Sequence, residues 1–131
     1  MGSIELIRTY DARAGEAKHA AVESAVGGVA PAVFLVDRIW PRGVSKADLP
    51  HDVWLKDLAP STKLRTWFKH DPERFAEFER RYTAELDENV DTARELISAA
   101  KQRNIVLLYS AKDERHNQAV VLRRWLLDRG I

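Results

Sequence analysis

Apolar residues along the chain form three runs that predict β-strands. Between Ile4 and Tyr10, the positions Ile4, Leu6, Arg8 and Tyr10 follow a period of two, a weak signal that indicates a half-buried strand. Ala32–Val36 and Ile105–Tyr109 are apolar throughout, a pattern typical of strands that are covered on both faces. We therefore expect these two segments at the centre of a sheet that lies between layers of helices.

Residues at helical spacing predict two helices in the middle of the chain. Ser61 is a suitable N-cap for a short helix that runs to Lys69. A second helix is expected from Asp71, because proline and glutamate follow this capping acid. An aromatic stripe then continues at helical spacing to Leu86, which makes this the most clearly marked helix of the sequence.

Further helical segments are expected on either side of these two. Val90–Arg103 is amphipathic, and it either continues the preceding helix or restarts near Asp87. Glu114–Arg129 predicts a final helix that ends at Gly130. Asp52–Leu58 is expected to form one or two helical turns within a long loop.

Two stretches lack a strong helical or strand periodicity of apolar residues. Residues 15–31 are rich in alanine and glycine, which predicts an irregular or mobile insertion, with a short helix over Glu16–Val26 as an alternative. Asp37–Pro60 contains prolines and a glycine and carries Trp40 and Trp54. A loop of this length is uncommon in a compact domain unless it has a function or packs on its own side chains.

The order of these elements predicts one α/β domain over residues 1–131. Strands alternate with helices, so the expected fold is a small layered domain with a mainly parallel sheet of three to four strands flanked by helices. The chain has 45% hydrophobic and 31% charged residues, a formal net charge of +1 and no cysteine. This composition predicts a cytoplasmic protein with no membrane segment and argues against broad nucleic-acid binding. The oligomeric state stays open.

A ligand site is expected at one edge of the sheet. If Ala32–Val36 and Ile105–Tyr109 are parallel neighbours, then Asp37-Arg38 and the segment 110–117 emerge together at the carboxyl edge, where open α/β sheets bind ligands. Segment 110–117 also opens a helix, whose free N–H groups favour anions. The predicted ligand is therefore a small anion such as a phosphate, a nucleotide or a carboxylate.

The donors predicted to bind this anion are Arg38, Arg42, Lys56, Lys112 and Asn117, and the candidates for acid–base catalysis are Asp37, Asp113 and His116. A structural interpretation stands beside each role. Asp37 and Arg38 are equally suited to a structural salt bridge or to contacts with loop carbonyls. Trp40–Gly43 is typical of a packing turn. Asp113 and Asn117 are typical of residues that cap helices or bind local backbone groups.

Several catalytic signatures are missing from the sequence. There is no glycine-rich phosphate loop, no pair of histidines on one helix face and no nucleophile elbow. The four histidines stand far apart, so neither a metal nor another cofactor is expected. Ser110 occupies the place where phosphatase-like and sulfurtransferase-like enzymes have a cysteine, and it would need His116 as its base.

Four segments of the sequence resemble the compact members of the bacterial family called domain of unknown function 488: VDRIWPRGVSK, WLKDLAPS, LRTWFKHDPERFAEFERRYTAEL and LLYSAKDERHNQAVVL. The resemblance covers nearly everything from Val36 to Leu122. It implies a small cytoplasmic α/β domain and brings no established reaction. Its polar signature positions include Arg8, Asp37, Arg38, Arg42, Lys56, Arg65, His70, Lys112, Asp113 and Asn117, so Arg8 joins the predicted ligand-binding residues. The chain departs from the family pattern between Gly15 and Val29.

Three functional interpretations stay open at this point. The first is a domain that binds a small anion, with hydrolase or transferase activity as an extension. The second is a non-catalytic module that docks a protein partner through the Trp-rich loop 40–67. The third, nucleic-acid binding through the arginines between Arg65 and Arg81, is weakened by the acidic residues interleaved with them.

Overall fold

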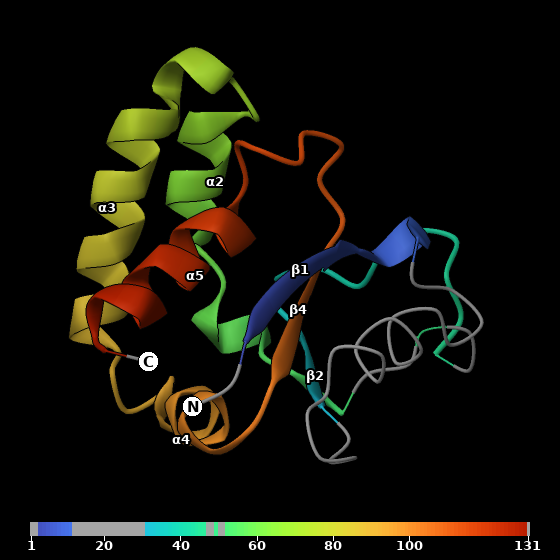
Figure 1. Ribbon diagram of the computed structural model, residues 1–131. Coiled ribbons are helices and arrows are strands. Elements are labelled where there is room, and N and C mark those ends of the chain that lie inside the picture. Colours follow the sequence, from blue (N-terminus) through green and yellow to red (C-terminus); the bar gives the residue numbers. More distant parts are fainter. Residues whose placement is uncertain (1–2, 12–30, 47–48, 50–51, 131) are drawn as a thin grey trace.

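The computed structural model describes residues 3–11, 31–46, 49 and 52–130 (Figure 1). The segment predicted to be an insertion, residues 15–31, lies outside this described part except for Pro31, and so does the alternative helix Glu16–Val26. The N-terminal and C-terminal ends of the described chain lie on the same side of the molecule (Figure 1).

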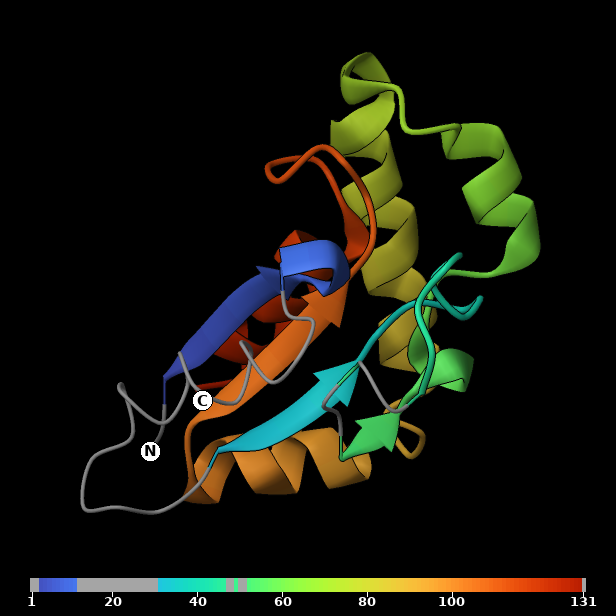
Figure 2. The same ribbon diagram turned by 90° about the vertical axis from the view of Figure 1, so that its right-hand side faces the viewer.

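Four parallel strands form the sheet in the order β1-β4-β2-β3, as the view in Figure 2 shows. They are β1 (Ile4–Arg8), β2 (Ala32–Leu35), β3 (Val53–Trp54) and β4 (Ile105–Tyr109). The prediction of a mainly parallel α/β sheet is confirmed. The two strands that are apolar throughout, β2 and β4, lie at its centre and are buried at every position.

The short strand β3 corrects the predicted helical turns over Asp52–Leu58. The backbone N–H groups of Asp52 and Leu55 donate to carbonyl oxygens of β2, each at 2.8 Å. A helical turn follows only from Lys56 to Leu58, as the 3-10 helix η4. This pairing depends on a neighbouring strand, so the local sequence pattern did not show it.

The described residues contain four α-helices together with short 3-10 turns. They are α2 (Thr62–Phe68), α3 (Phe75–Glu88), α4 (Arg94–Gln102) and α5 (Gln118–Asp128), with the 3-10 helices η1 (Thr9–Asp11) and η5 (Pro72–Arg74). The predicted caps are confirmed: Ser61 accepts a hydrogen bond from the N–H of Leu64, and Asp71 from that of Glu73. Between α3 and α4 the chain makes turns, so the second amphipathic segment restarts as a separate helix.

The last helix begins four residues later than predicted, at Gln118 instead of Glu114. Asn117 is its N-cap, because its side chain accepts a hydrogen bond from the N–H of Val120 at 3.1 Å. The residues before it form a separate turn around Asp113. An acidic and polar stretch therefore makes a structured loop where the sequence pattern predicted the first helical turn.

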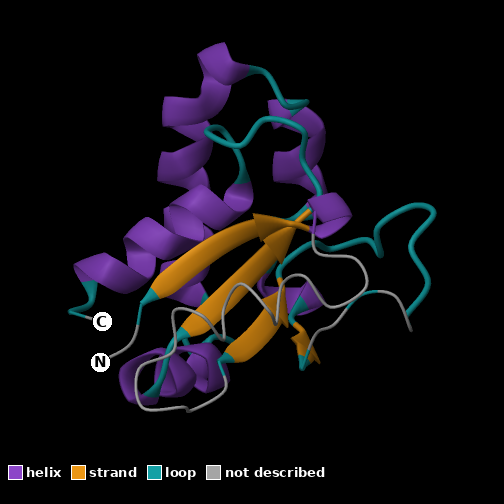
Figure 3. Ribbon diagram, turned by 45° about the vertical axis from the view of Figure 1, so that its right-hand side comes forward, coloured by secondary structure: helices purple, strands orange, loops and turns teal. Residues whose placement is uncertain are grey.

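The two faces of the sheet are covered differently. The side chains of one face belong to the same hydrophobic cluster as residues of all four α-helices, with Phe34 of β2 and Leu107 of β4 joined to Phe78 and Leu122. The other face packs, in the described part of the chain, on the loop after β2 and on β3. The sheet residues are Val33, Leu35, Val106 and Leu108, and the covering residues are Trp40, Val44 and Leu49 of the loop and Trp54 of β3. In the described part of the chain, a Trp-braced loop supplies this second layer. Figure 3 shows the arrowheads of the strands pointing to one side, where the loops leave the sheet.

In the part of the chain that the structure describes, no helix combines the length and the apolar character needed to cross a membrane.

Candidate functional site

The register of the three longer strands brings three polar residues into one row. Leu35 of β2 pairs with Leu108, and Arg8 of β1 pairs with Tyr109. Continuing this register past the strand ends places Thr9, Ser110 and Asp37 side by side. The hydroxyl oxygens of Thr9 and Ser110 are 2.9 Å apart, and the N–H of Ser110 donates to Oδ1 of Asp37 at 3.3 Å. β2 and β4 are thus parallel neighbours, and the condition for Asp37 and Ser110 to emerge at one edge is met.

Asp37 is held firmly at this edge. Its side chain is only 8% exposed, and its Oδ1 also accepts a hydrogen bond of 2.6 Å from the amide of Gln118, the first residue of α5. Burial raises the pKa of the Asp37 carboxyl above its ordinary value, although the hydrogen bonds from Ser110 and Gln118 and the charge of Arg65 act in the opposite direction.

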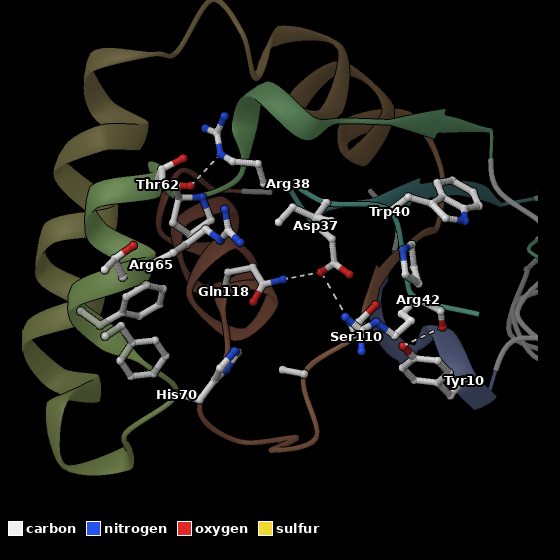
Figure 4. A pocket seen from close by; sticks show the side chains of 17 residues that line it. Tyr10, Asp37, Arg38, Trp40, Arg42, Thr62, Arg65, His70, Ser110 and Gln118 are labelled. Carbon is white, nitrogen blue, oxygen red and sulfur yellow. Dashed lines mark hydrogen bonds between the residues drawn. The ribbon is translucent and has the colours of Figure 1, made fainter. Parts of the chain in front are cut away.

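A pocket of about 430 Å³ opens above this carboxylate (Figure 4). Seventeen residues line it, from the segment after β1, the loop after β2, helix α2 and the turn after it, helix α3, the segment after β4 and the start of α5. Tyr10 and Trp40 stand on one side, and the α2 residue Arg65 and His70 stand on the other, with Asp37 between them (Figure 4). The site therefore combines aromatic walls with a buried carboxylate and several cations.

Three arginines and one carboxylate give this pocket an excess of positive charge. Arg38 is engaged, because its Nε donates to the carbonyl of Pro60 at 3.0 Å and its Nη2 to that of Ala59 at 3.2 Å. The side chains of Arg42 and Arg65 make no hydrogen bond and no ion pair with the described residues. Of the three pocket arginines, only Arg38 is therefore engaged by the described residues.

Two tryptophans shape the loop that carries Asp37 and Arg42. Trp54 of β3 donates through Nε1 to the carbonyl of Asp37 at 2.7 Å, and Trp40 donates to the carbonyl of Val44 at 2.6 Å. The N–H of Val44 bonds back to Pro41, and Gly43 between them has a φ of +77°. The predicted glycine-dependent turn is confirmed, and it sets the position of Arg42 at the pocket.

Residues 16–130 match the family whose description reads "Inactive DUF488-N3 subclade". The chain belongs to the DUF488 family. The resemblance proposed from the four sequence segments is therefore confirmed. The chain is 45% identical over 93 residues to the uncharacterized protein YeaO of Escherichia coli, covering 71% of this chain and 81% of YeaO. It is 52% identical over 59 residues to the uncharacterized protein Rv3073c of Mycobacterium tuberculosis, covering 45% of this chain and half of that protein. No solved structure gives a significant match.

The DUF488 signature residues divide into two groups in space. Asp37, Arg38 and Arg42 line the pocket, as do the signature residues Arg65 and His70. The other predicted site residues, Arg8, Lys56, Lys112, Asp113, His116 and Asn117, are not among its lining. Lys56 instead lies over the ring of Trp54 at 5.4 Å, and the guanidinium of Arg8 lies over that of Tyr10 at 5.5 Å.

The segment 113–117 organises its own loop. Oδ1 of Asp113 accepts hydrogen bonds from the N–H groups of Arg115 and His116, and its Oδ2 is 2.8 Å from Nδ1 of His116. The first of these bonds makes the largest contribution to lowering the pKa of the Asp113 carboxyl. Asn117 is 1% exposed and bonds the carbonyl of Asp113 as well as capping α5. This geometry agrees with the structural interpretation of Asp113 and Asn117.

The sequence reasoning left Arg65 and Gln118 out of the candidate site. Arg65 is a signature position of the DUF488 resemblance, and the sequence assigned it a role only among the arginines considered for nucleic-acid binding. Gln118 could have been found from the cap, because the residue after an N-cap lies at the end of the helix that faces the carboxyl edge of the sheet. Among the described residues, no three histidine or acidic side chains are grouped so that they could hold a metal ion.

Proposed function

We propose that this DUF488 protein binds a small anionic ligand in the pocket at the carboxyl edge of the sheet. Arg65 carries the proposal, because its half-buried guanidinium lines the pocket and has no hydrogen-bonding or ionic partner in the described chain. A partly desolvated cation costs free energy unless a counter-charge accompanies it. A ligand anion would supply that charge.

The surroundings of Arg65 support an anion more than a cation. Arg42 adds a second unengaged guanidinium, whereas the one carboxylate of the pocket, Asp37, is buried beneath it and already accepts two hydrogen bonds. A volume of about 430 Å³ lies within the range typical of sites for small molecules. Arginine is also the side chain best suited to bidentate contacts with phosphate or carboxylate groups.

We propose binding without turnover. The nucleophile considered from the sequence, Ser110, shares a hydrogen bond with Thr9 and also lies against the carboxylate of Asp37. His116, the base it would need, is bonded to Asp113 and is not among the pocket residues. The family description names an inactive subclade, which agrees with this reading. Asp37 is the pocket carboxylate beside Ser110, and its Oδ1 is already occupied by the hydrogen bonds from the Ser110 N–H and the Gln118 amide.

The protein-docking alternative has less support, because the tryptophans of loop 40–67 are used within the chain. Trp40 and Trp54 pack edge to face with ring centroids 5.4 Å apart. Trp67 lies under the guanidinium groups of Arg74 and Arg81, at 5.4 and 4.2 Å. Ile39, with 64% of its surface exposed, is the large apolar side chain of this loop that stands out into solvent.

Calorimetric titration of the whole chain with sulfate, pyrophosphate and citrate tests the proposal. Arg65→Gln should weaken binding by about tenfold or more, corresponding to the loss of one charge-assisted contact. Arg123→Gln, which removes the same charge from the exposed side of α5, is the matched control and should leave the affinity unchanged. Equal affinities for the two variants, or no binding by the wild-type chain, would contradict an anion site at this pocket.

A further inference from the structure

Asp37 and Arg65 carry opposite charges in one pocket without touching. Both line the cavity, and the charge of Arg65 lowers the pKa of the Asp37 carboxyl, yet the two side chains form neither an ion pair nor a hydrogen bond. Figure 4 shows Asp37, Arg65 and Gln118 converging on the same space. A ligand group that fits there must satisfy a carboxylate on one side and a guanidinium on the other.

The orientation of Asp37 defines what that group must offer. The N–H of Ser110 and the amide of Gln118 both donate to Oδ1, so neither of these bonds uses Oδ2. An ionised carboxylate only accepts hydrogen bonds, and a guanidinium only donates them. The complementary ligand group therefore has a hydrogen-bond donor directly beside an acceptor.

A simple anion does not meet this requirement alone. A phosphate or carboxylate placed against Asp37 would set two negative charges side by side in a partly desolvated site, which is unfavourable. The negative group of the ligand is better placed away from Asp37, between Arg65 and Arg42, which both line the pocket. The part of the ligand that reaches Asp37 should then be uncharged.

We propose that the natural ligand carries an amide, lactam or imide edge together with an anionic group. This inference rests on the proposed anion site and deepens it. The N–H of the edge donates to Asp37, its neighbouring carbonyl accepts one hydrogen bond from Arg65, and the anionic group binds the remaining donors of Arg65 together with Arg42. The aromatic side chains Tyr10, Trp40 and Phe68 line the same pocket, and they suit a flat heterocyclic ring.

Three probes distinguish binding of the anionic group from binding of the imide edge: uridine 5′-monophosphate, its N3-methyl derivative and ribose 5-phosphate. All three carry the same phosphate, but only the first offers an imide N–H. We expect uridine 5′-monophosphate to bind the wild-type chain at least about tenfold more tightly than either of the others, since losing a buried hydrogen bond leaves its partner unpaired. Calorimetry or amide shifts of Ser110 and Gln118 would measure this.

The variant Asp37→Asn provides a second test of the proposal. Because Ser110 and Gln118 donate to Oδ1, the new amide group should take the place of Oδ2 and present donors to the ligand N–H. The variant should bind ribose 5-phosphate as well as or better than the wild-type chain, and it should lose the preference for the imide over its N3-methyl form. The amide spectrum checks that the variant is folded, and the comparison of probes on the wild-type chain needs no variant.

The outcomes distinguish the two proposals. If ribose 5-phosphate binds in an Arg65-dependent way and methylation at N3 changes nothing, the anion site stands and the inference about the imide edge is wrong. If none of the three probes binds, and sulfate, pyrophosphate and citrate do not bind either, both proposals are overturned. A preference for the unmethylated probe that persists in Asp37→Asn would also contradict the role given to Asp37.

Discussion

Gln118 donates a hydrogen bond of 2.6 Å to Asp37, a residue 81 positions earlier in the chain. This bond joins the start of α5 to the end of β2, and the N–H of Ser110 at the end of β4 adds to it. A buried carboxylate held in this way is costly, because desolvation of its charge is only partly offset by the hydrogen bonds it accepts. Burial of this charge therefore lowers the stability of the folded state instead of raising it.

The variant Asp37→Asn should therefore be more stable than the wild-type chain at neutral pH. The folded-state pKa of Asp37 lies above its ordinary value of 3.8, so the penalty for its charge is absent well below pH 3.8 and grows as the pH rises through the folded-state pKa. Thermal unfolding at pH values from about 3 to about 8 should show that the stability difference between variant and wild type shrinks as the pH falls.

Asp113→Asn is the matched control, and its expected effect on stability has the opposite sign. The pKa of Asp113 is lowered, mainly by the hydrogen bond from the N–H of Arg115, so its charge stabilises the folded state above pH 3.8 and this contribution is lost as the pH falls. The control variant should be less stable than the wild type at neutral pH and should approach it in acid. The same pH dependence for both variants would contradict the contrast between a buried and a hydrogen-bonded, solvated carboxylate.

Arg38→Lys should lower the free energy of unfolding by about 1–3 kcal/mol. The guanidinium of Arg38 binds the carbonyl groups of Pro60 and Ala59 together, and an ammonium group cannot reproduce this fork. Arg42→Lys is the control, since its exposed side chain has no such contact in the described chain. Urea unfolding midpoints compare the two. Equal stability of both variants would show that the contacts of Arg38 with the loop carbonyls contribute little.

Tyr82→Phe should cost about 1–3 kcal/mol of stability. Tyr82 is 1% exposed and its hydroxyl donates to the carbonyl of Leu58 at 2.8 Å, so the change leaves that carbonyl without this donor. Burial also raises the pKa of Tyr82, which keeps the hydroxyl protonated. Thr83→Ala, at the next position of α3, should change the denaturation midpoint little. A Tyr82→Phe variant as stable as the wild type would mean that the Leu58 carbonyl finds another donor.

Gly43→Ala should destabilise the turn beside the pocket by about 1–2 kcal/mol. The φ of Gly43 is +77°, and a Cβ built there meets no atom within 4 Å, so the cost comes from the backbone conformation alone. Gly43→Asn should cost less, because asparagine adopts this conformation more readily than alanine. Chemical denaturation of both variants measures the difference. If alanine and asparagine were equally costly, a lost contact instead of backbone strain would be indicated.

Local chemistry in the sequence was enough to determine much of the fold. The apolar character of β2 and β4 required burial on both faces and therefore a central position. Ser61 and Asp71 marked the starts of α2 and η5, because a capping side chain bonds N–H groups only two or three residues away. The sequence alone also determined which strand ends carry the polar residues.

Only the tertiary structure decided which of those polar residues share a pocket. Asp37, Arg65 and Gln118 come from a strand end and two helices, and their meeting depends on the strand order and on how α2 and α5 pack beside the sheet. Asp113 and Asn117 are also polar residues near this edge, but their side chains are engaged in hydrogen bonds with nearby backbone N–H groups. Residue type determined which chemistry was available, and long-range packing decided where it was assembled.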